Sequence, residues 1–372
     1  MLRGKSFPEY GYVLIALFAL TIALSTLFSP AQTTVVSVSL RSLFVLLVAC
    51  GLSVLLPCTL ETLTRLCLCL TLAGTFAGAL ALAGVLCLHR NIDFLAFTIT
   101  RPDYMYGLPE VQSFFGNPNG HGFFLVFSIA AAVILLALWR RLKERKRPAA
   151  LLFYVILAVQ LAALALTFSR AAFVALAVFV LGFIWYNSRR YCYTSLVLLS
   201  AAAFVSKQAF EKSGIVEVIT ALANGRIQLW AEGLKIFKLY PLFGTGLGGW
   251  AALSGHYLSP HNTYLHVAVE LGLVGLALYL IYIALFMKDL RKMMLGAAAG
   301  SARYIILSGL YSLCLGLLVH QFFESYLYHG LPLFLLAITP LHFLMREPGV
   351  LCRFRERIWS EQDFSRAHRR VS

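Results

Sequence analysis

Apolar runs of about 20 residues recur along this chain, and this feature constrains its fold more than any other. One such helix spans the hydrocarbon core of a bilayer, whereas a membrane barrel would show strands of about 10 residues with alternating polarity. Only 13% of the 372 residues are charged and 60% are hydrophobic, so there are too few charges to cover a water-facing surface. The sequence therefore predicts an all-α, polytopic membrane protein and excludes a soluble enzyme.

Ten membrane spans are predicted from these runs, at residues 10–29, 35–56, 66–88, 121–139, 149–168, 171–187, 192–205, 265–287, 304–323 and 331–345. The seventh is the weakest prediction because it is short. Residues 1–372 then form a single integral membrane domain, with 206–264 as a long loop inserted between spans and 346–372 as a basic tail. A second long segment, 89–120, lies on the same side as the loop.

The 31 Lys and Arg residues outnumber the 16 Asp and Glu residues, and most of these cations fall on one side of the predicted spans. The positive-inside rule makes that side cytoplasmic, which predicts cytoplasmic N- and C-termini and places both long segments outside. The formal net charge of +15 is thus a topology signal, and nucleic-acid binding loses its support. The eight Cys residues contain no CxxC motif and no Cys/His cluster, so neither a disulfide framework nor a metal site is expected.

Three polar motifs stand at the outer ends of spans, where helix N-termini present free N–H groups and partial positive charge. They are Asn117 and Asn119 with His121, the pair Ser169-Arg170, and residues 259–263. A cation at such a place is unfavourable unless an anion joins it, so Arg170 indicates an anionic ligand. Two simpler interpretations stay open: a cap and turn at Asn117, and a turn in which Arg170 anchors the chain at the membrane interface.

The outer loop contains a predicted amphipathic helix that begins after Asn224-Gly225. Four apolar residues recur at helical spacing and predict its apolar face: Ile227, Trp230, Leu234 and Phe237. Arg226 falls in the first turn, again a cation at a helix N-terminus. Arg226 and Arg170 together are suited to binding a phosphate or diphosphate group. The alternative is that Arg226 pairs with Glu217 or Glu232 on the surface.

His261 is the candidate general base, because a helix N-terminus favours neutral imidazole, which accepts a proton at neutral pH. Asn262 is expected to orient its ring. Glu324, at the outer end of the ninth span, and Arg41, within the second, are further candidates, although the two could simply pair with each other. Residues 244–249 match GxGxxG, but no strand precedes them, so we predict a flexible turn there and no nucleotide site.

Several of these strings resemble motifs of the O-antigen ligase and polymerase superfamily. They are Asn117-Pro118-Asn119, Phe168-Ser169-Arg170, Gly225-Arg226-Ile227-Gln228-Leu229-Trp230, Pro241-Leu242-Phe243-Gly244-Thr245-Gly246, His261-Asn262-Thr263-Tyr264-Leu265 and Glu270-Leu271-Gly272. The resemblance implies a GT-C-type helical bundle of about 10 to 12 spans with a long periplasmic loop that carries amphipathic helices. It also implies a metal- and cofactor-independent glycosyltransferase on the periplasmic face of a bacterial inner membrane.

By motif position, Arg170 and Arg226 would hold the diphosphate of a lipid-linked donor and His261 would activate the acceptor hydroxyl. The substrate-binding candidates from this reading of the sequence are Asn262, Asn117, Asn119, His121, Trp230, Arg41 and Glu324. The expected activity is that of an O-antigen ligase, which transfers undecaprenyl-diphosphate-linked O-polysaccharide to lipid A-core in lipopolysaccharide biosynthesis. The transfer is expected to invert the anomeric configuration of the transferred sugar.

Two alternatives to the ligase stay open. A surface-polysaccharide polymerase would use the same donor with a second lipid-linked glycan as acceptor. A lipid-linked sugar transporter would need charged residues along a path through several spans, whereas here the polar motifs collect on one side.

Overall fold

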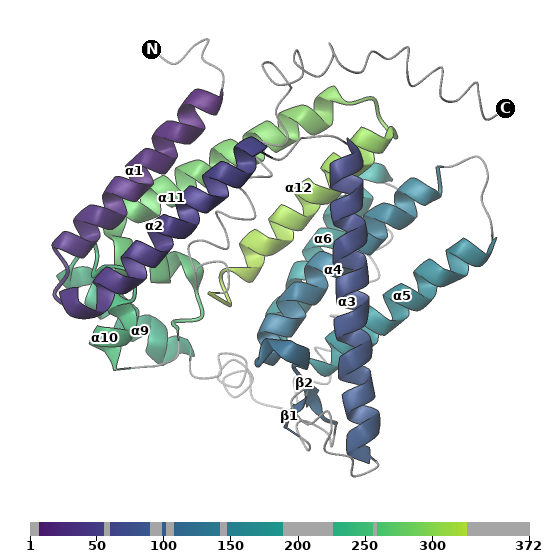
Figure 1. The fold of residues 1–372 in the computed structure, drawn as a ribbon, viewed down its shortest axis with the longest axis horizontal. Helices are drawn as coiled ribbons and strands as arrows, with labels where there is room; N and C mark the ends of the chain where they lie inside the picture. The colour runs from purple at the N-terminus through teal and green to yellow at the C-terminus, as the bar shows by residue number, and fades with distance from the viewer. Residues whose placement is uncertain are drawn as a thin grey trace, which may run out of the picture.

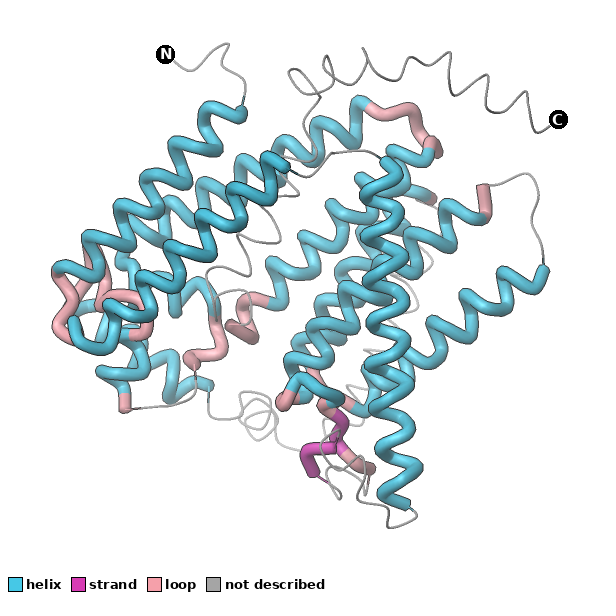
Figure 2. Tube along the Cα trace, viewed as in Figure 1, coloured by secondary structure: helices cyan, strands magenta, loops and turns pink. Residues whose placement is uncertain are grey.

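The computed structural model describes residues 7–55, 60–89, 99–101, 108–141, 147–188, 226–255 and 259–325. These are mostly helical, with one short antiparallel hairpin (Figure 2). The long helices are α1 (Phe7–Leu27), α2 (Gln32–Leu55), α3 (Leu60–His89), α4 (Pro118–Trp139), α5 (Arg147–Leu166), α6 (Arg170–Asn187), α11 (Thr263–Gly296) and α12 (Ala302–His320). The shorter elements are β1 (Ile99–Arg101), β2 (Glu110–Val111), the 3-10 helix η2 (Ser113–Phe115), α9 (Arg226–Leu239) and α10 (Gly249–Ser254).

The long helices coincide with all of the predicted spans except the seventh and tenth, 192–205 and 331–345, which lie outside the described residues together with the basic tail. Within the described chain, five helices are long and apolar enough to cross a membrane: α3, α4, α6, α11 and α12. Large apolar side chains such as Phe44, Phe76 and Leu151 are exposed on the outer surfaces of the helices. Lipid covers such surfaces, and the protein is an integral membrane protein.

The helices approach one another closely at small residues, which is how helices pack in a bilayer. A Cβ on Gly316 of α12 would collide with the carbonyl oxygen of Ala175 in α6, and the two helices lie side by side in Figure 1. Polar side chains add hydrogen bonds between helices. Gln160 Nε2 of α5 donates to Thr71 O (3.1 Å) and to Thr75 Oγ1 (2.9 Å) of α3.

The helix α11 is broken inside its apolar run at Gly272, which has φ +68° and ψ −169°. The backbone groups exposed by the break pair with the loop that follows α9. Thr245 N donates to Val269 O (3.0 Å), Gly246 N to Glu270 O (2.9 Å), Leu273 N to Pro241 O (2.8 Å) and Val274 N to Leu242 O (3.3 Å). The segment 244–249 is therefore a turn, as predicted, and backbone hydrogen bonds at Thr245 and Gly246 attach it to α11.

The helix α9 is present, and half of its predicted packed face is confirmed, because Trp230 donates to Pro260 O and Phe237 packs on the buried cluster at Ile236. Ile227 and Leu234 are 52% and 51% exposed, whereas Gly233 and Ile236 are buried. A Cβ on Gly233 would lie 2.9 Å from Leu265 Cδ2, so α9 rests directly on α11 at this glycine. The predicted cap, Asn224-Gly225, lies outside the described residues.

Candidate functional site

The start of α11 positions His261. Asn262 is the N-cap of this helix, and its Oδ1 accepts a hydrogen bond from Leu265 N (3.0 Å). His261 therefore stands just before the helix, with φ +49°, a left-handed conformation that is uncommon for a residue other than glycine. In this structure the side chain of Asn262 serves as the helix cap, and the imidazole of His261 contacts Glu324.

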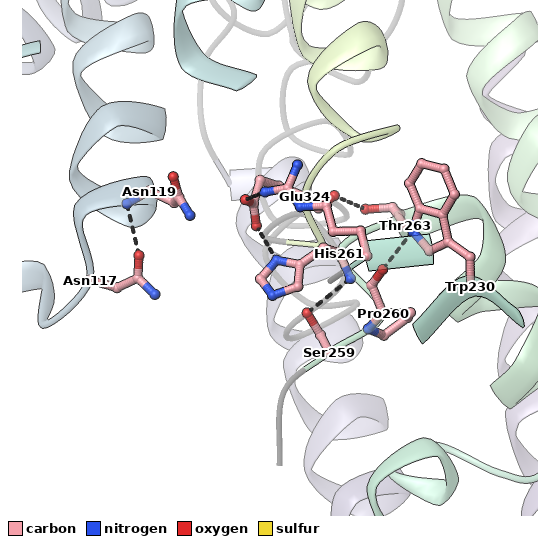
Figure 3. Close-up of polar contacts among 9 residues, drawn as sticks. Asn117, Asn119, Trp230, Ser259, Pro260, His261, Thr263 and Glu324 are labelled. Atoms are coloured by element: carbon pink, nitrogen blue, oxygen red, sulfur yellow. Dashed lines mark hydrogen bonds and ion pairs between the residues drawn. The ribbon is translucent and has the colours of Figure 1, made fainter. Parts of the chain in front are cut away.

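The end of α12 brings Glu324 to the same place (Figure 3). Beyond His320 the chain turns, and Phe323 N and Glu324 N both donate to His320 O, at 2.9 and 3.0 Å. Thr263 connects the two helices, since its N donates to Gln321 O (2.8 Å) and its Oγ1 to Glu324 O (3.0 Å). The first residue of α11 thus fixes the turn that carries Glu324.

The carboxylate of Glu324 joins two predicted site residues that lie far apart in the sequence. Its Oε1 accepts from Arg226 Nη2 at 2.6 Å, and its Oε2 lies 2.8 Å from His261 Nδ1. The side chain of Glu324 is 1% exposed, that of Arg226 17% and that of His261 22%. The carboxylate therefore lies behind the guanidinium and the imidazole, both of which keep solvent access.

This contact defines which imidazole nitrogen is available for chemistry. An ionised carboxylate only accepts hydrogen bonds, so a neutral His261 must carry its proton on Nδ1, where it faces Glu324. Nε2 then has a free lone pair, and within the described residues no group donates to it. The pair has the geometry of a general base oriented by a carboxylate.

The position of Arg226 follows from the packing of α9. Trp230 Nε1, one turn along the helix, donates to Pro260 O at 2.9 Å and so ties α9 to the residue before His261. Glu232 pairs with Lys235 at 3.2 Å, and Glu324 is the partner of Arg226. Pairing of Arg226 with Glu232, or of Glu324 with Arg41, is thereby excluded, while Glu217 lies outside the described residues.

The motif at Asn117 forms a cap, as its simpler interpretation predicted. Asn117 is the N-cap of α4, and its Oδ1 accepts from Asn119 N at 2.8 Å. Figure 3 shows both asparagines at the left of the view, on a different helix and apart from His261 and Glu324 near its centre. His121 is fully buried and stacks on Phe115, with 5.5 Å between ring centroids, so a substrate does not reach its ring in this structure.

The remaining candidates are Arg170 and Arg41. Arg170 is the exposed first residue of α6, and its neighbour Ser169 packs against the first turn of α4, where a Cβ on Gly122 would lie 2.9 Å from Ser169 Cβ. Phe123, in the same turn, lies 4.9 Å from the ring of His320 at the end of α12. The first turn of α4 is thus in contact with both the Arg170 motif and the helix that leads to Glu324. Arg41 is exposed on α2 and is not brought to this cluster.

Sequence reasoning missed the residues that hold the site together. Thr263 and Pro260 were visible only as parts of the motif around His261, and their contacts run to Glu324 and Trp230. His320, buried one turn before Glu324, was overlooked, although a histidine at the outer end of a span was the signal for it. No three of the described His, Cys, Asp and Glu side chains are grouped as metal ligands.

Residues 155–280 match a family model described as O-Antigen ligase. The matched stretch contains Arg170, Arg226 and His261, whereas Glu324 and the Asn117 motif lie beyond it. No curated protein matches the chain.

Proposed function

We propose that this protein is a membrane glycosyltransferase of the O-antigen ligase family. It transfers an O-polysaccharide from undecaprenyl diphosphate to the sugar of lipid A-core. The observation that carries the proposal is the cluster in which Glu324 bridges Arg226 and His261 at one end of the helical bundle. The match of residues 155–280 to the ligase family supports the same conclusion.

In this mechanism His261 Nε2 takes the proton from the acceptor hydroxyl as its oxygen attacks the anomeric carbon. The carbon–oxygen bond to the donor phosphate breaks, and the lipid diphosphate leaves with the electron pair. A single displacement of this kind inverts the anomeric configuration. Glu324 keeps the proton of His261 on Nδ1 and stabilises the imidazolium that forms, which is the role of a carboxylate behind a catalytic histidine.

Arg226 stabilises the charge that develops on the leaving diphosphate. Its guanidinium has five N–H donors, and the hydrogen bond to Glu324 is made through Nη2, so the other donors can bind phosphate oxygens. Arg170, exposed at the start of α6, provides the second cation. Guanidinium groups that bind the leaving diphosphate would provide electrostatic stabilisation of the kind that most strongly accelerates enzymatic reactions.

The proposed setting is the periplasmic face of a bacterial inner membrane, in a GT-C-type bundle of ten to twelve spans with both termini in the cytoplasm. The distribution of Lys and Arg supports this orientation. His261, Arg226 and Glu324 then face the periplasm, where lipid-linked O-polysaccharide and lipid A-core meet.

A gene deletion complemented with wild type or His261→Ala tests the proposal. We expect wild type to restore lipopolysaccharide capped with O-polysaccharide. His261→Ala should give uncapped core while long polymer accumulates on the lipid carrier, because the acceptor hydroxyl is no longer deprotonated. The measurements are the lipopolysaccharide ladder and the pool of lipid-linked glycan.

His121→Ala is the control, because that ring is buried against Phe115 and the proposed mechanism assigns no step to it. Protein amount in the membrane is measured for each variant, so that loss of folding is distinguished from loss of chemistry. A lipopolysaccharide core that carries a single repeat unit in the deletion strain would show that the protein is a polymerase. A ladder unchanged by the deletion would exclude both the ligase and the polymerase activity.

A further inference from the structure

A second buried carboxylate, Glu270, lies in α11 just before the break at Gly272. Its Oε1 accepts from Gly248 N at 2.9 Å and from Trp250 N at 3.2 Å, and His266 Nε2 lies 3.3 Å from the same oxygen. The carboxylate therefore holds the backbone at the start of α10, which has no other side-chain cap.

The backbone of Glu270 is held as firmly as its side chain. Its carbonyl oxygen accepts from Gly246 N at 2.9 Å and from Ser25 Oγ of α1 at 2.7 Å. A Cβ on Gly244 would collide with this same peptide group, so loop and helix are in direct backbone contact. Glu270 thus joins three elements: α1, the loop before α10, and α11.

Trp250, whose backbone N–H is bound by Glu270, connects that carboxylate to α9. This tryptophan is buried and packs with Ile236 of α9 and Val269 of α11. A Cβ on Gly233 of α9 would lie 3.3 Å from its ring. Seven residues earlier along α9, on the same helix face, stands Arg226. The packing of Trp250 therefore helps to fix the position of α9. That position in turn determines where the guanidinium of Arg226 lies relative to Glu324.

We propose that Glu270 is a positioning residue for Arg226: by holding Gly248 and Trp250, it fixes α9 so that the guanidinium stands where the leaving diphosphate forms. This role rests on the proposed glycosyl transfer. Glu270 itself does not touch the substrate, since its carboxylate is buried among His266, Gly248 and Trp250. The interactions of Glu270 act on the reaction only through Arg226.

The test compares Glu270→Gln with wild type in purified protein, using undecaprenyl-diphosphate-linked O-polysaccharide as donor and lipid A-core as acceptor. The glutamine keeps an oxygen acceptor of similar shape but loses the charge that strengthens three contacts to one oxygen. We expect kcat to fall by about 10²-fold, because a misplacement of about 1 Å at a reacting group has this effect. Glu232→Gln, a matched change at the exposed Glu232–Lys235 pair on α9, should leave kcat unchanged.

A double-mutant cycle separates positioning from general structural damage. In an Arg226→Lys background, whose kcat is already low, Glu270→Gln should change kcat by no more than about twofold, because both changes act on one interaction. An equal fold-loss in both backgrounds would overturn the inference, as would full activity of Glu270→Gln beside active wild type. No transfer by wild type itself would instead overturn the proposed function.

Discussion

An Arg226→Ala variant is expected to transfer glycan about 10²- to 10³-fold more slowly than wild type, which is the usual effect of removing one donor that stabilises a developing anion. Arg226 reaches the site from the first turn of α9 and donates to Glu324 at 2.6 Å. The side chain of Arg226 keeps 17% exposure, so its remaining N–H groups are accessible to a phosphate ligand. The measurement is kcat for transfer from the lipid-linked donor.

The single variant leaves the buried carboxylate of Glu324 without its cation, a change that typically destabilises a protein by about 3–5 kcal/mol. The double variant Arg226→Ala/Glu324→Gln removes both charges and should accumulate in the membrane like wild type. It should nevertheless be as inactive as Arg226→Ala. Wild-type activity in this folded double variant would remove both residues from the mechanism.

A Gly272→Ala variant is expected to fail to assemble, with little protein recovered from the membrane. The backbone of Gly272 has φ +68° and ψ −169°, a region open essentially to glycine, and a residue forced into it costs about 1–3 kcal/mol. A Cβ there would also collide with the carbonyl oxygen of Leu242. That oxygen accepts the hydrogen bond of Val274 N, just after the break in α11. Separation of the loop from α11 would leave backbone groups unpaired in the membrane, at several kcal/mol each.

Two other glycines provide matched controls for this prediction. Gly255 also has a positive φ, +67°, but no atom of the described residues lies within 4 Å of a Cβ built there, so Gly255→Ala should cost only about 1–2 kcal/mol. Gly296, at the end of α11, has open space as well, and Gly296→Ala should be neutral. Normal recovery and heat stability of Gly272→Ala would contradict the account of the break in α11.

The sequence predicted those parts of the fold that depend on local pattern. Apolar runs located the long helices, because each run matches the thickness of a bilayer. The cap at Asn117 and the helix starts at Arg170 and Arg226 follow from polar residues directly before or within the first turns of helices. His261 and Glu324 were chosen from their places at the ends of spans.

The sequence could not reveal contacts between distant segments. Arg226 and Glu324 are 98 residues apart, and no helical periodicity relates them. The packed face of α9 was predicted only in part, because Gly233 adds nothing to an apolar pattern, although its lack of a side chain is what lets α9 rest on Leu265. The break at Gly272 lies inside an apolar run and depends on backbone partners from residues 241–246.

We propose that Arg226, Glu324 and His261 catalyse the transfer of glycan from a lipid diphosphate to lipid A-core. The most direct measurement incubates the purified protein with undecaprenyl-diphosphate-linked O-polysaccharide and lipid A-core, and follows capped lipopolysaccharide and released undecaprenyl diphosphate together. We expect equal amounts of both products from wild type, and neither product from His261→Ala or from Arg226→Ala/Glu324→Gln. Capped product from the folded double variant at the wild-type rate, or no product from wild type, would contradict the account.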